Sequence, residues 1–136
     1  EGFIDRDKSK RTLFCLNEHD KGKYSKSTYM MKGYYPPISY LDVFPLTGRT
    51  HQIRVHMKSI GHPILCDRNY GGGQSMIKSF HTKYTGCLKS VMKSLDRVAL
   101  HAHSIEFKHP KSSVLTKFIA PIPEDFLYIL NIIKDK

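Results

Sequence analysis

The most constraining feature of the chain is a short amphipathic helix predicted between an apolar strand pattern and a glycine. The strand pattern covers Ile38 to Phe44, the next segment, Pro45 to His56, reads PLTGRTHQIRVH, and Gly61 is a typical helix end. On a helical wheel, basic residues share one face and apolar residues the other: His51, Arg54 and Lys58, against Ile53, Met57 and Ile60. We therefore expect one face to pack on a core and the other to present cationic groups.

Arg54 lies at the seam between these two faces. Its aliphatic stem can be buried there while its guanidinium reaches a carboxylate with two nitrogens. From the pattern alone, however, the segment is equally typical of a basic surface helix in any soluble domain. The sequence around it is needed to separate these interpretations.

Longer motifs resemble the C-terminal part of the RluA-type pseudouridine synthases. In chain order they read GKYSKSTY from Gly22, TGRTHQIRVH from Thr47, IGHPILCD from Ile60 followed by Tyr70-Gly71, RVALHA from Arg97, IEFKHP from Ile105 and APIPEDF from Ala120. These matches follow the family's order across nearly the whole chain. The chain departs from the family at Cys66, where glycine is usual, and over Lys78 to Met92, which has the character of an insertion or divergent loop and helix.

The resemblance implies part of the pseudouridine synthase fold, an α+β domain with a mostly antiparallel mixed sheet and flanking helices. The residue patterns favour the same class. They predict strands at Arg11–Asn17, Lys26–Lys32, Ile38–Phe44, around Ile105 and Phe107, and at Val114–Ile119. They predict helices with buried stripes at Leu88, Val91, Met92 and Leu95, and, from Pro123, at Phe126, Ile129, Leu130 and Ile133. They predict connections at the charged turn His19–Gly22, the loop Gly33–Pro37 and a flexible Gly71–Gly73 loop.

The resemblance also implies isomerisation of uridine to pseudouridine in structured RNA (tRNA or rRNA), without a cofactor. Family members carry their nucleophilic aspartate in an upstream Arg-Leu-Asp motif, followed by a tyrosine motif, and neither motif is present here. Asp67 matches a different family aspartate, which we expect to hold a loop. Residues 1–136 are thus expected to be the C-terminal part of a catalytic domain, inactive alone and able to pair with an N-terminal half. A non-catalytic RNA-binding relative, or the RNA-binding half of a split enzyme, is the alternative.

By its place in the motif, Arg54 is expected to pair with that nucleophilic aspartate. Burial alone would raise the pKa of the aspartate, and a guanidinium partner opposes the shift. Residues that bind the substrate are expected at the start of the helix predicted in the TGRTHQIRVH motif, the signature helix, and at one later histidine: Arg49, Thr50, His51, Gln52 and His101. Free backbone N–H groups at a helix start suit phosphate or base contacts. Capping and loop anchoring remain alternatives for Arg49, His51 and His101.

The composition indicates a polyanionic partner. Lys and Arg number 22 against 12 acidic residues, which gives a net charge of +10 and favours RNA.

Three widely spaced cysteines argue against a disulfide framework and a zinc site, and favour cytoplasm or another reducing intracellular compartment. His51 and His56 diverge by about 140° on a helix, so no metal site is expected. The longest apolar run, Phe126 to Ile133, is too short to span a bilayer, and the complete protein is expected to be a monomer.

Overall fold

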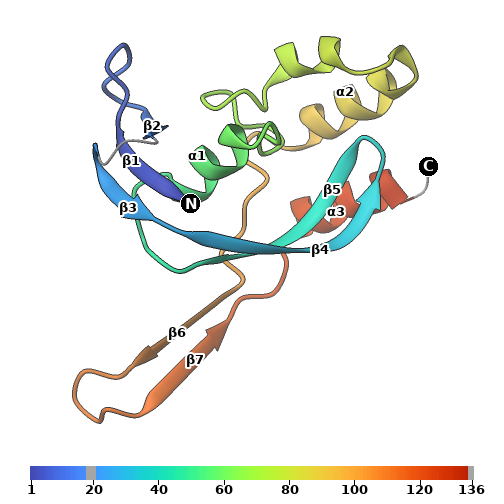
Figure 1. Cartoon of the computed structure of the whole chain (residues 1–136). Helices are drawn as coiled ribbons and strands as arrows, with labels where there is room; N and C mark the ends of the chain where they lie inside the picture. The colour runs from blue at the N-terminus through green and yellow to red at the C-terminus, as the bar shows by residue number, and fades with distance from the viewer. Residues whose placement is uncertain (18–20, 135–136) are drawn as a thin grey trace.

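Strands and helices are interleaved along the chain, as the computed structural model shows for residues 1–17 and 21–134 (Figure 1). The strands are β1 (Gly2–Arg6), β2 (Phe14–Asn17), β3 (Lys23–Ser25), β4 (Ser27–Tyr35), β5 (Ile38–Pro45), β6 (Ser104–Lys108) and β7 (Leu115–Ile119). The α-helices are α1 (Gln52–Ser59), α2 (Thr85–Ser94) and α3 (Glu124–Lys134), and 3-10 turns form η1 (Gln74–Ser79) and η2 (Thr82–Tyr84). The predicted α+β class is confirmed.

All strand pairings in the described part of the chain are antiparallel, but they form separate sheets. The orders are β2-β1-β3, β4-β5 and β6-β7. In the first sheet, Phe3 lies opposite Asn17 on β2 and Tyr24 on β3. The mixed sheet expected from the family resemblance is therefore represented here by separate antiparallel pieces.

In the part of the chain that the structure describes, the core is divided among three clusters of buried side chains. One joins α2 to α3 through Cys87, Val91, Leu95, Ile129, Leu130 and Ile133, and Tyr40 of β5 packs against it. A second joins the first sheet to α1 through Ile4, Val55 and Tyr70. A third, of Ile77, Leu88 and Met92, joins η1 to α2. The stripes predicted for α2 and α3 are thus confirmed, with Phe126 half-buried at the edge.

The signature helix is shorter than predicted, and its buried face differs. Because α1 begins at Gln52, the predicted helical residues Arg49 to His51 lie before it. His51 takes a left-handed conformation at φ 54°, which separates the preceding loop from the helix. Ile60, expected in the core, is 48% exposed, whereas Val55 is buried. Val55 contacts Ile4 and Tyr70, so α1 buries the side that faces the first sheet and the loop after the helix.

Several strand boundaries also differ from the prediction. β2 begins at Phe14 instead of Arg11, because the Asp7 carboxylate accepts hydrogen bonds from the backbone of Ser9 and Lys10 and shapes a turn there. The predicted Lys26–Lys32 strand lies within β4, apart from Lys26, and pairs with β5. The short strand β3 precedes it and pairs instead with β1. β4 continues to Tyr35, so only the two prolines remain from the predicted Gly33–Pro37 loop. Part of the His19–Gly22 turn lies outside the described residues.

The segment at residues 71–73, predicted to be a flexible glycine loop, forms a tight turn that packs against residues 64–67. The Gly72 backbone N–H donates to the Asp67 carbonyl at 2.8 Å. A Cβ atom on Gly72 would lie 1.7 Å from the Ile64 carbonyl oxygen, so no other residue fits without displacing that backbone. The glycines allow close approach of the two chain segments around Asp67.

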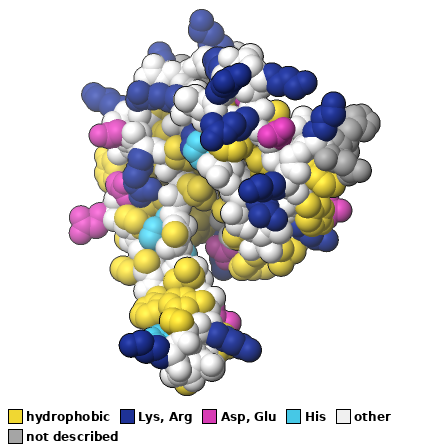
Figure 2. Space-filling model, turned by 90° about the vertical axis from the view of Figure 1, so that its left-hand side faces the viewer, with side chains coloured by type: hydrophobic (Ala, Val, Ile, Leu, Met, Phe, Trp, Pro, Cys, Tyr) yellow, Lys and Arg dark blue, Asp and Glu magenta, His cyan; other side chains and the backbone are white. Residues whose placement is uncertain are grey.

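The β6–β7 hairpin projects away from the rest of the molecule (Figure 1). Ile105, Phe107 and Phe118 share one of its faces and are 60%, 40% and 57% exposed. The rings of Phe107 and Phe118 stack at 6.0 Å between centroids. Figure 2 shows hydrophobic side chains gathered on this hairpin. Within the described residues, nothing covers this apolar face.

Cys66, the residue that departs from the family's usual glycine, adopts φ 64°. This left-handed conformation is disfavoured for residues with a Cβ atom and is freely accessible to glycine. A glycine at this position would therefore relieve the backbone of the strain that the Cβ atom of Cys66 causes.

We predict that Cys66→Gly is more stable than Cys66→Ala by about 1 kcal/mol. Both variants lose the thiol, so the difference isolates the cost of a Cβ atom at positive φ. Denaturant unfolding of the two variants measures it. An alanine variant at least as stable as the glycine variant would contradict the explanation.

Candidate functional site

The centre of the candidate site is a buried ion pair between Arg54 of α1 and Asp67 of the following loop. Arg54 Nε donates to Asp67 Oδ2 at 2.7 Å, and Nη2 donates to Oδ1 at 2.8 Å. The side chains are 16% and 1% exposed. The hydrogen bond to the Asp67 carboxylate raises the pKa of Arg54 above its ordinary value. Asp67 Oδ1 also accepts from the backbone N–H of Asn69 and Tyr70 at 3.2 Å, which is the loop-holding role predicted for this residue.

Tyr70 lies against the cationic face of α1. The Arg54 guanidinium lies 4.7 Å from its ring centroid and the Lys58 ammonium 5.9 Å. Its hydroxyl accepts from the Phe14 backbone N–H at 2.9 Å and lies 2.8 Å from His51 Nδ1. The predicted face of basic residues is therefore real, but a buried aromatic ring packs against it.

His51 is held as an acceptor at the start of this helix. Since the Tyr70 oxygen already accepts from Phe14, its proton is free to be donated to His51 Nδ1. Burial, followed by the positive charge of Arg54, lowers the pKa of His51. The neutral imidazole is thus favoured in this position.

Gln52 is a buried structural link. Its Oε1 accepts from the Thr47 hydroxyl and from the Arg49 backbone N–H, at 2.7 and 3.0 Å. Its Nε2 donates to the Lys26 carbonyl and the Ser27 hydroxyl, both at 2.9 Å. Every hydrogen-bonding position of the amide is used inside the chain. In the structure, Gln52 therefore connects the Thr47–Arg49 loop to Lys26 and Ser27. Its contact with substrate stays a prediction.

The other predicted substrate-binding residues occupy different surroundings. Arg49 is exposed and donates from Nε to the Tyr24 carbonyl at 2.9 Å, while Thr50 is exposed beside it. The structure therefore brings Arg49, Thr50, His51 and Gln52 into one loop and helix start. His101 lies at the base of the hairpin, near the Ala120 carbonyl at 3.4 Å. No contact among the described residues joins it to the Arg54 cluster.

A second buried network involves His56, whose importance the helical wheel did not reveal. His56 Nε2 lies 2.9 Å from the Ser25 hydroxyl, and Nδ1 lies 3.0 Å from the Ser27 hydroxyl. Ser25 donates to the Gly2 carbonyl, so His56 Nε2 carries the proton and donates to Ser25. Ser27 accepts from Gln52 and donates to Nδ1. Burial lowers the pKa of His56, which agrees with a neutral ring.

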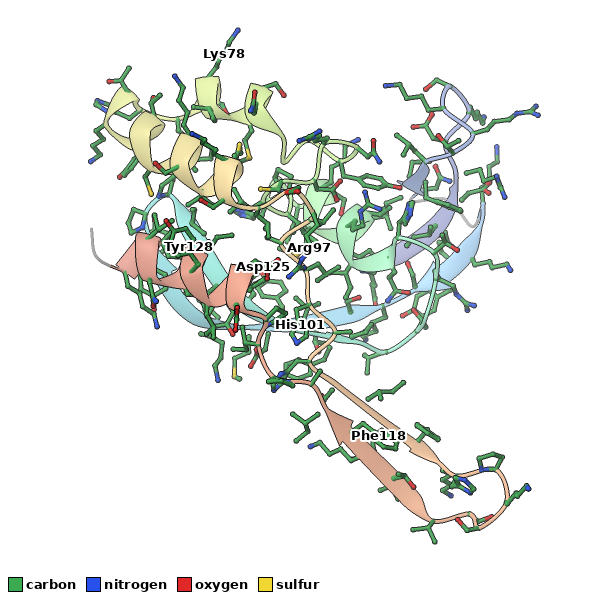
Figure 3. All side chains as sticks on the ribbon, turned by 180° about the vertical axis from the view of Figure 1, so that it is seen from behind. Lys78, Arg97, His101, Phe118, Asp125 and Tyr128 are labelled. Atoms are coloured by element: carbon green, nitrogen blue, oxygen red, sulfur yellow. The ribbon has the colours of Figure 1, made fainter. Side chains whose placement is uncertain are left out.

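An exposed ion pair anchors the C-terminal helix. Arg97 Nε and Nη2 donate to the Asp125 carboxylate at 2.8 and 2.9 Å, with the two side chains 42% and 38% exposed. Figure 3 shows the two side chains facing each other, from the segment before the hairpin and from α3. The Arg97 guanidinium also donates from Nη1 to the Leu100 carbonyl at 3.1 Å. Both residues belong to the family-like motifs RVALHA and APIPEDF, but no residue pattern indicates that they pair.

The chemical capacity of the Arg54 cluster is that of a fixed cationic anchor. Asp67 uses Nε and Nη2, whereas no described residue accepts a hydrogen bond from Nη1. A further carboxylate or phosphate can therefore approach Arg54 only through its remaining nitrogen edge. The chain contains no Arg-Leu-Asp motif, so the pairing of Arg54 with a nucleophilic aspartate stays a prediction.

Three further properties of the described part bear on function. No group of three His, Cys, Asp or Glu side chains within it could hold a metal ion. None of its helices has the length and apolar character that crossing a lipid bilayer requires. Its cysteines, Cys15, Cys66 and Cys87, are free.

The two ion pairs have nearly the same geometry and different burial, which gives a matched comparison. We predict that Arg54→Ala lowers the free energy of unfolding by about 3–5 kcal/mol, because it leaves the Asp67 carboxylate buried and unpaired. Arg97→Ala should cost at most about 1 kcal/mol, because water screens the exposed pair. Urea unfolding measures both losses. Equal losses would show that burial of Asp67 does not determine the energetics.

The His56 network predicts a pH dependence of stability. Because the pKa of His56 in the folded chain is below its ordinary value of 6.5, the unfolded chain binds more protons in that range. Stability should be complete above that value and fall as the pH decreases from there towards the folded pKa. Urea unfolding at a series of pH values tests this, with His56→Gln as the control. If the variant keeps the full pH dependence of stability below pH 6.5, then His56 does not cause it. The pKa of His51 is also lowered, so His51 should account for any pH dependence that remains in the variant.

Comparisons with known proteins identify the family of this chain. It is 36% identical over 129 residues, 95% of its length, to ribosomal large subunit pseudouridine synthase D of Haemophilus influenzae. It is 40% identical over 82% of its length to synthase C of Haemophilus ducreyi, and 43% identical over 62% to the chloroplastic RNA pseudouridine synthase 2 of Oryza sativa.

The chain spans only part of each of these relatives: 38%, 31% and 20% of their lengths, respectively. No family model matches it. The identity of 36% over 95% of the chain nevertheless shows its family. The chain belongs to the RluA-type pseudouridine synthase family.

Proposed function

We propose that this chain is the C-terminal part of the catalytic domain of an RNA pseudouridine synthase, which isomerises uridine in structured RNA, either rRNA or tRNA. The observation that carries the proposal is its identity of 36% with RNA pseudouridine synthases over 92–95% of its own length. The nucleophilic aspartate would come from an N-terminal part that is not in this sequence.

In this proposal, Arg54 is the catalytic residue contributed by the chain. Helix α1 carries the Arg54 side chain, the Tyr70 ring packs against its guanidinium, and the Asp67 carboxylate orients it. The guanidinium is therefore fixed before substrate arrives. The Nη1 edge would pair with the nucleophilic carboxylate and keep it ionised in a closed pocket, where burial alone would raise its pKa. Preorganisation of this kind places the charge without reorganisation during the reaction. No cofactor is required for it.

Substrate binding is proposed for the loop before α1 and for the basic surface. Arg49 and Thr50 are exposed beside the Arg54 cluster, where they can contact the RNA backbone or the extruded base. His51 and Gln52 would act by holding that loop, since their polar atoms are engaged inside the chain. His101, which contacts no described residue of the Arg54 cluster, would bind substrate at the base of the hairpin. We also propose a reducing intracellular compartment, in keeping with three free cysteines.

The exposed face of the β6–β7 hairpin is evidence that a partner segment packs there. The face of Ile105, Phe107 and Phe118 is apolar and exposed, and an isolated two-stranded hairpin is at best marginally stable in water. Its unpaired strand edges are also ready to accept another strand. We propose that the N-terminal half of the same catalytic domain covers this face, and that the complete protein is a monomer. The alternative function, an RNA-binding relative without catalysis, is favoured by one observation only, the lack of an Arg-Leu-Asp motif in this sequence.

We predict that the 136-residue chain alone releases no tritium from RNA labelled at uridine C5, and that adding a separately expressed N-terminal half with the aspartate motif restores release. Isomerisation frees that label to water, so the readout is direct. Positioned cationic groups lower a barrier but do not replace a missing nucleophile. Release by the chain alone would contradict this location of the nucleophile, whereas no release from the mixture would support the binding-only alternative.

In the active mixture, Arg54→Lys should lower turnover by at least about tenfold while changing the RNA dissociation constant little. Lysine keeps the charge but loses the planar fork that Asp67 orients. Arg97→Lys provides the matched control, because Arg97 holds an exposed carboxylate in the same two-pronged geometry. Near-normal turnover of Arg54→Lys would remove this residue from the catalytic step.

A further inference from the structure

The groove between the 3-10 turns and α2 carries positive charge that the proposed catalytic site does not use. It is an open hollow with a volume of about 710 Å³. Its lining contains Gln74, Ile77, Lys78, Phe80, Thr82, Thr85, Lys89 and Lys93. Three of these residues are lysines and none is acidic. In Figure 3, Lys78 extends outward from η1 into solvent.

The charge of this region is unopposed over a long stretch of sequence. From Arg68 to Leu95 the chain contains no Asp or Glu, while it contains Arg68, Lys78, Lys83, Lys89 and Lys93. None of these five residues forms an ion pair among the described residues. Lys89 and Lys93 are four residues apart on α2, so they lie on the same face of the helix. An acidic ligand can therefore approach without displacing an existing partner.

The floor of the groove is fixed by packing. Ile77, Leu88 and Met92 form a buried cluster that joins η1 to α2, and Phe80 packs against it. The lysines therefore extend from a structured surface. Phe80 is partly exposed at the edge of the groove, where an aromatic ring can stack on an unpaired base.

We propose that this groove is a second RNA-binding surface, in which Lys78, Lys89 and Lys93 contact backbone phosphates and Phe80 stacks on an unpaired base. The inference rests on the proposed function, because it takes RNA as the polyanion. A purely acidic segment would use the lysines and leave Phe80 unused, whereas RNA offers phosphates for the lysines and unpaired bases for the ring, so RNA fits the combination of groups better. The surface would hold the RNA outside the uridine pocket and contribute affinity without chemistry.

The test is the salt dependence of RNA binding by the 136-residue chain. The probe is a fluorescein-labelled stem-loop RNA with an unpaired loop, titrated from low to physiological salt by fluorescence anisotropy. A Lys78→Gln, Lys89→Gln, Lys93→Gln triple variant keeps the exposed stems and removes the charges. We expect weaker binding and a slope of log affinity against log salt reduced by about 2 to 3, because each lost phosphate contact removes about 0.7 to 0.9.

The matched control is a Lys108→Gln, Lys111→Gln, Lys117→Gln triple variant of the hairpin, which changes the net charge equally. The inference predicts a clearly smaller effect there, and an equal effect in both variants would overturn it. Phe80→Leu should weaken binding of the looped RNA and leave polyglutamate binding unchanged. Polyglutamate that competes as well as RNA would instead identify an acidic-protein site and overturn the proposal. If the unaltered chain binds no RNA, both the groove and the proposed function fail, whereas normal binding by the groove variant refutes the groove alone.

Discussion

The ion pair between Arg54 and Asp67 organises the segment on which the rest of the candidate site depends. The buried Asp67 carboxylate accepts from two guanidinium nitrogens and from two backbone N–H groups of its own loop. That loop delivers Tyr70, whose ring covers Arg54 and whose hydroxyl reaches β2 and His51. A buried ion pair is poor evidence for net stability, since desolvation offsets much of the attraction. Its contribution here is geometric, because it holds helix, loop and strand in one arrangement.

Backbone strain is found at both ends of this arrangement. His51 and Cys66 adopt positive φ immediately before α1 and immediately before Asp67. Such conformations persist only where surrounding contacts impose them. For His51 the contact is the hydrogen bond with Tyr70, and for Cys66 the neighbouring Asp67 is fixed by its ion pair. The strain is thus maintained by the same cluster that would orient Arg54 in the proposed reaction.

The motifs and the periodic segments could be predicted from the sequence, whereas the hydrogen-bonding partners could not. α2 and α3 were predictable because their apolar stripes recur at helical spacing, and the strand Ile38–Phe44 because it is short and apolar. The start of α1 could not be predicted, because a left-handed conformation at His51 gives no signal in a residue pattern. Gln52 and His56 resemble polar surface residues in the sequence. Their burial depends on partners in β3, in β4 and at Lys26 between them, which lie 25 to 31 residues away in the sequence.

The distribution of polar and apolar groups separates the surfaces that the proposed enzyme would need. Around Arg54, most polar atoms are already paired within the chain, so the site is held in place, while one guanidinium edge has no partner among the described residues. The hairpin differs from this site, because its surface is formed largely by exposed apolar side chains. Water opposes exposure of the apolar face, whereas a phosphate backbone would gain nothing from it. A protein segment is therefore the better occupant of the hairpin, which leaves the cationic surfaces of the chain available to RNA.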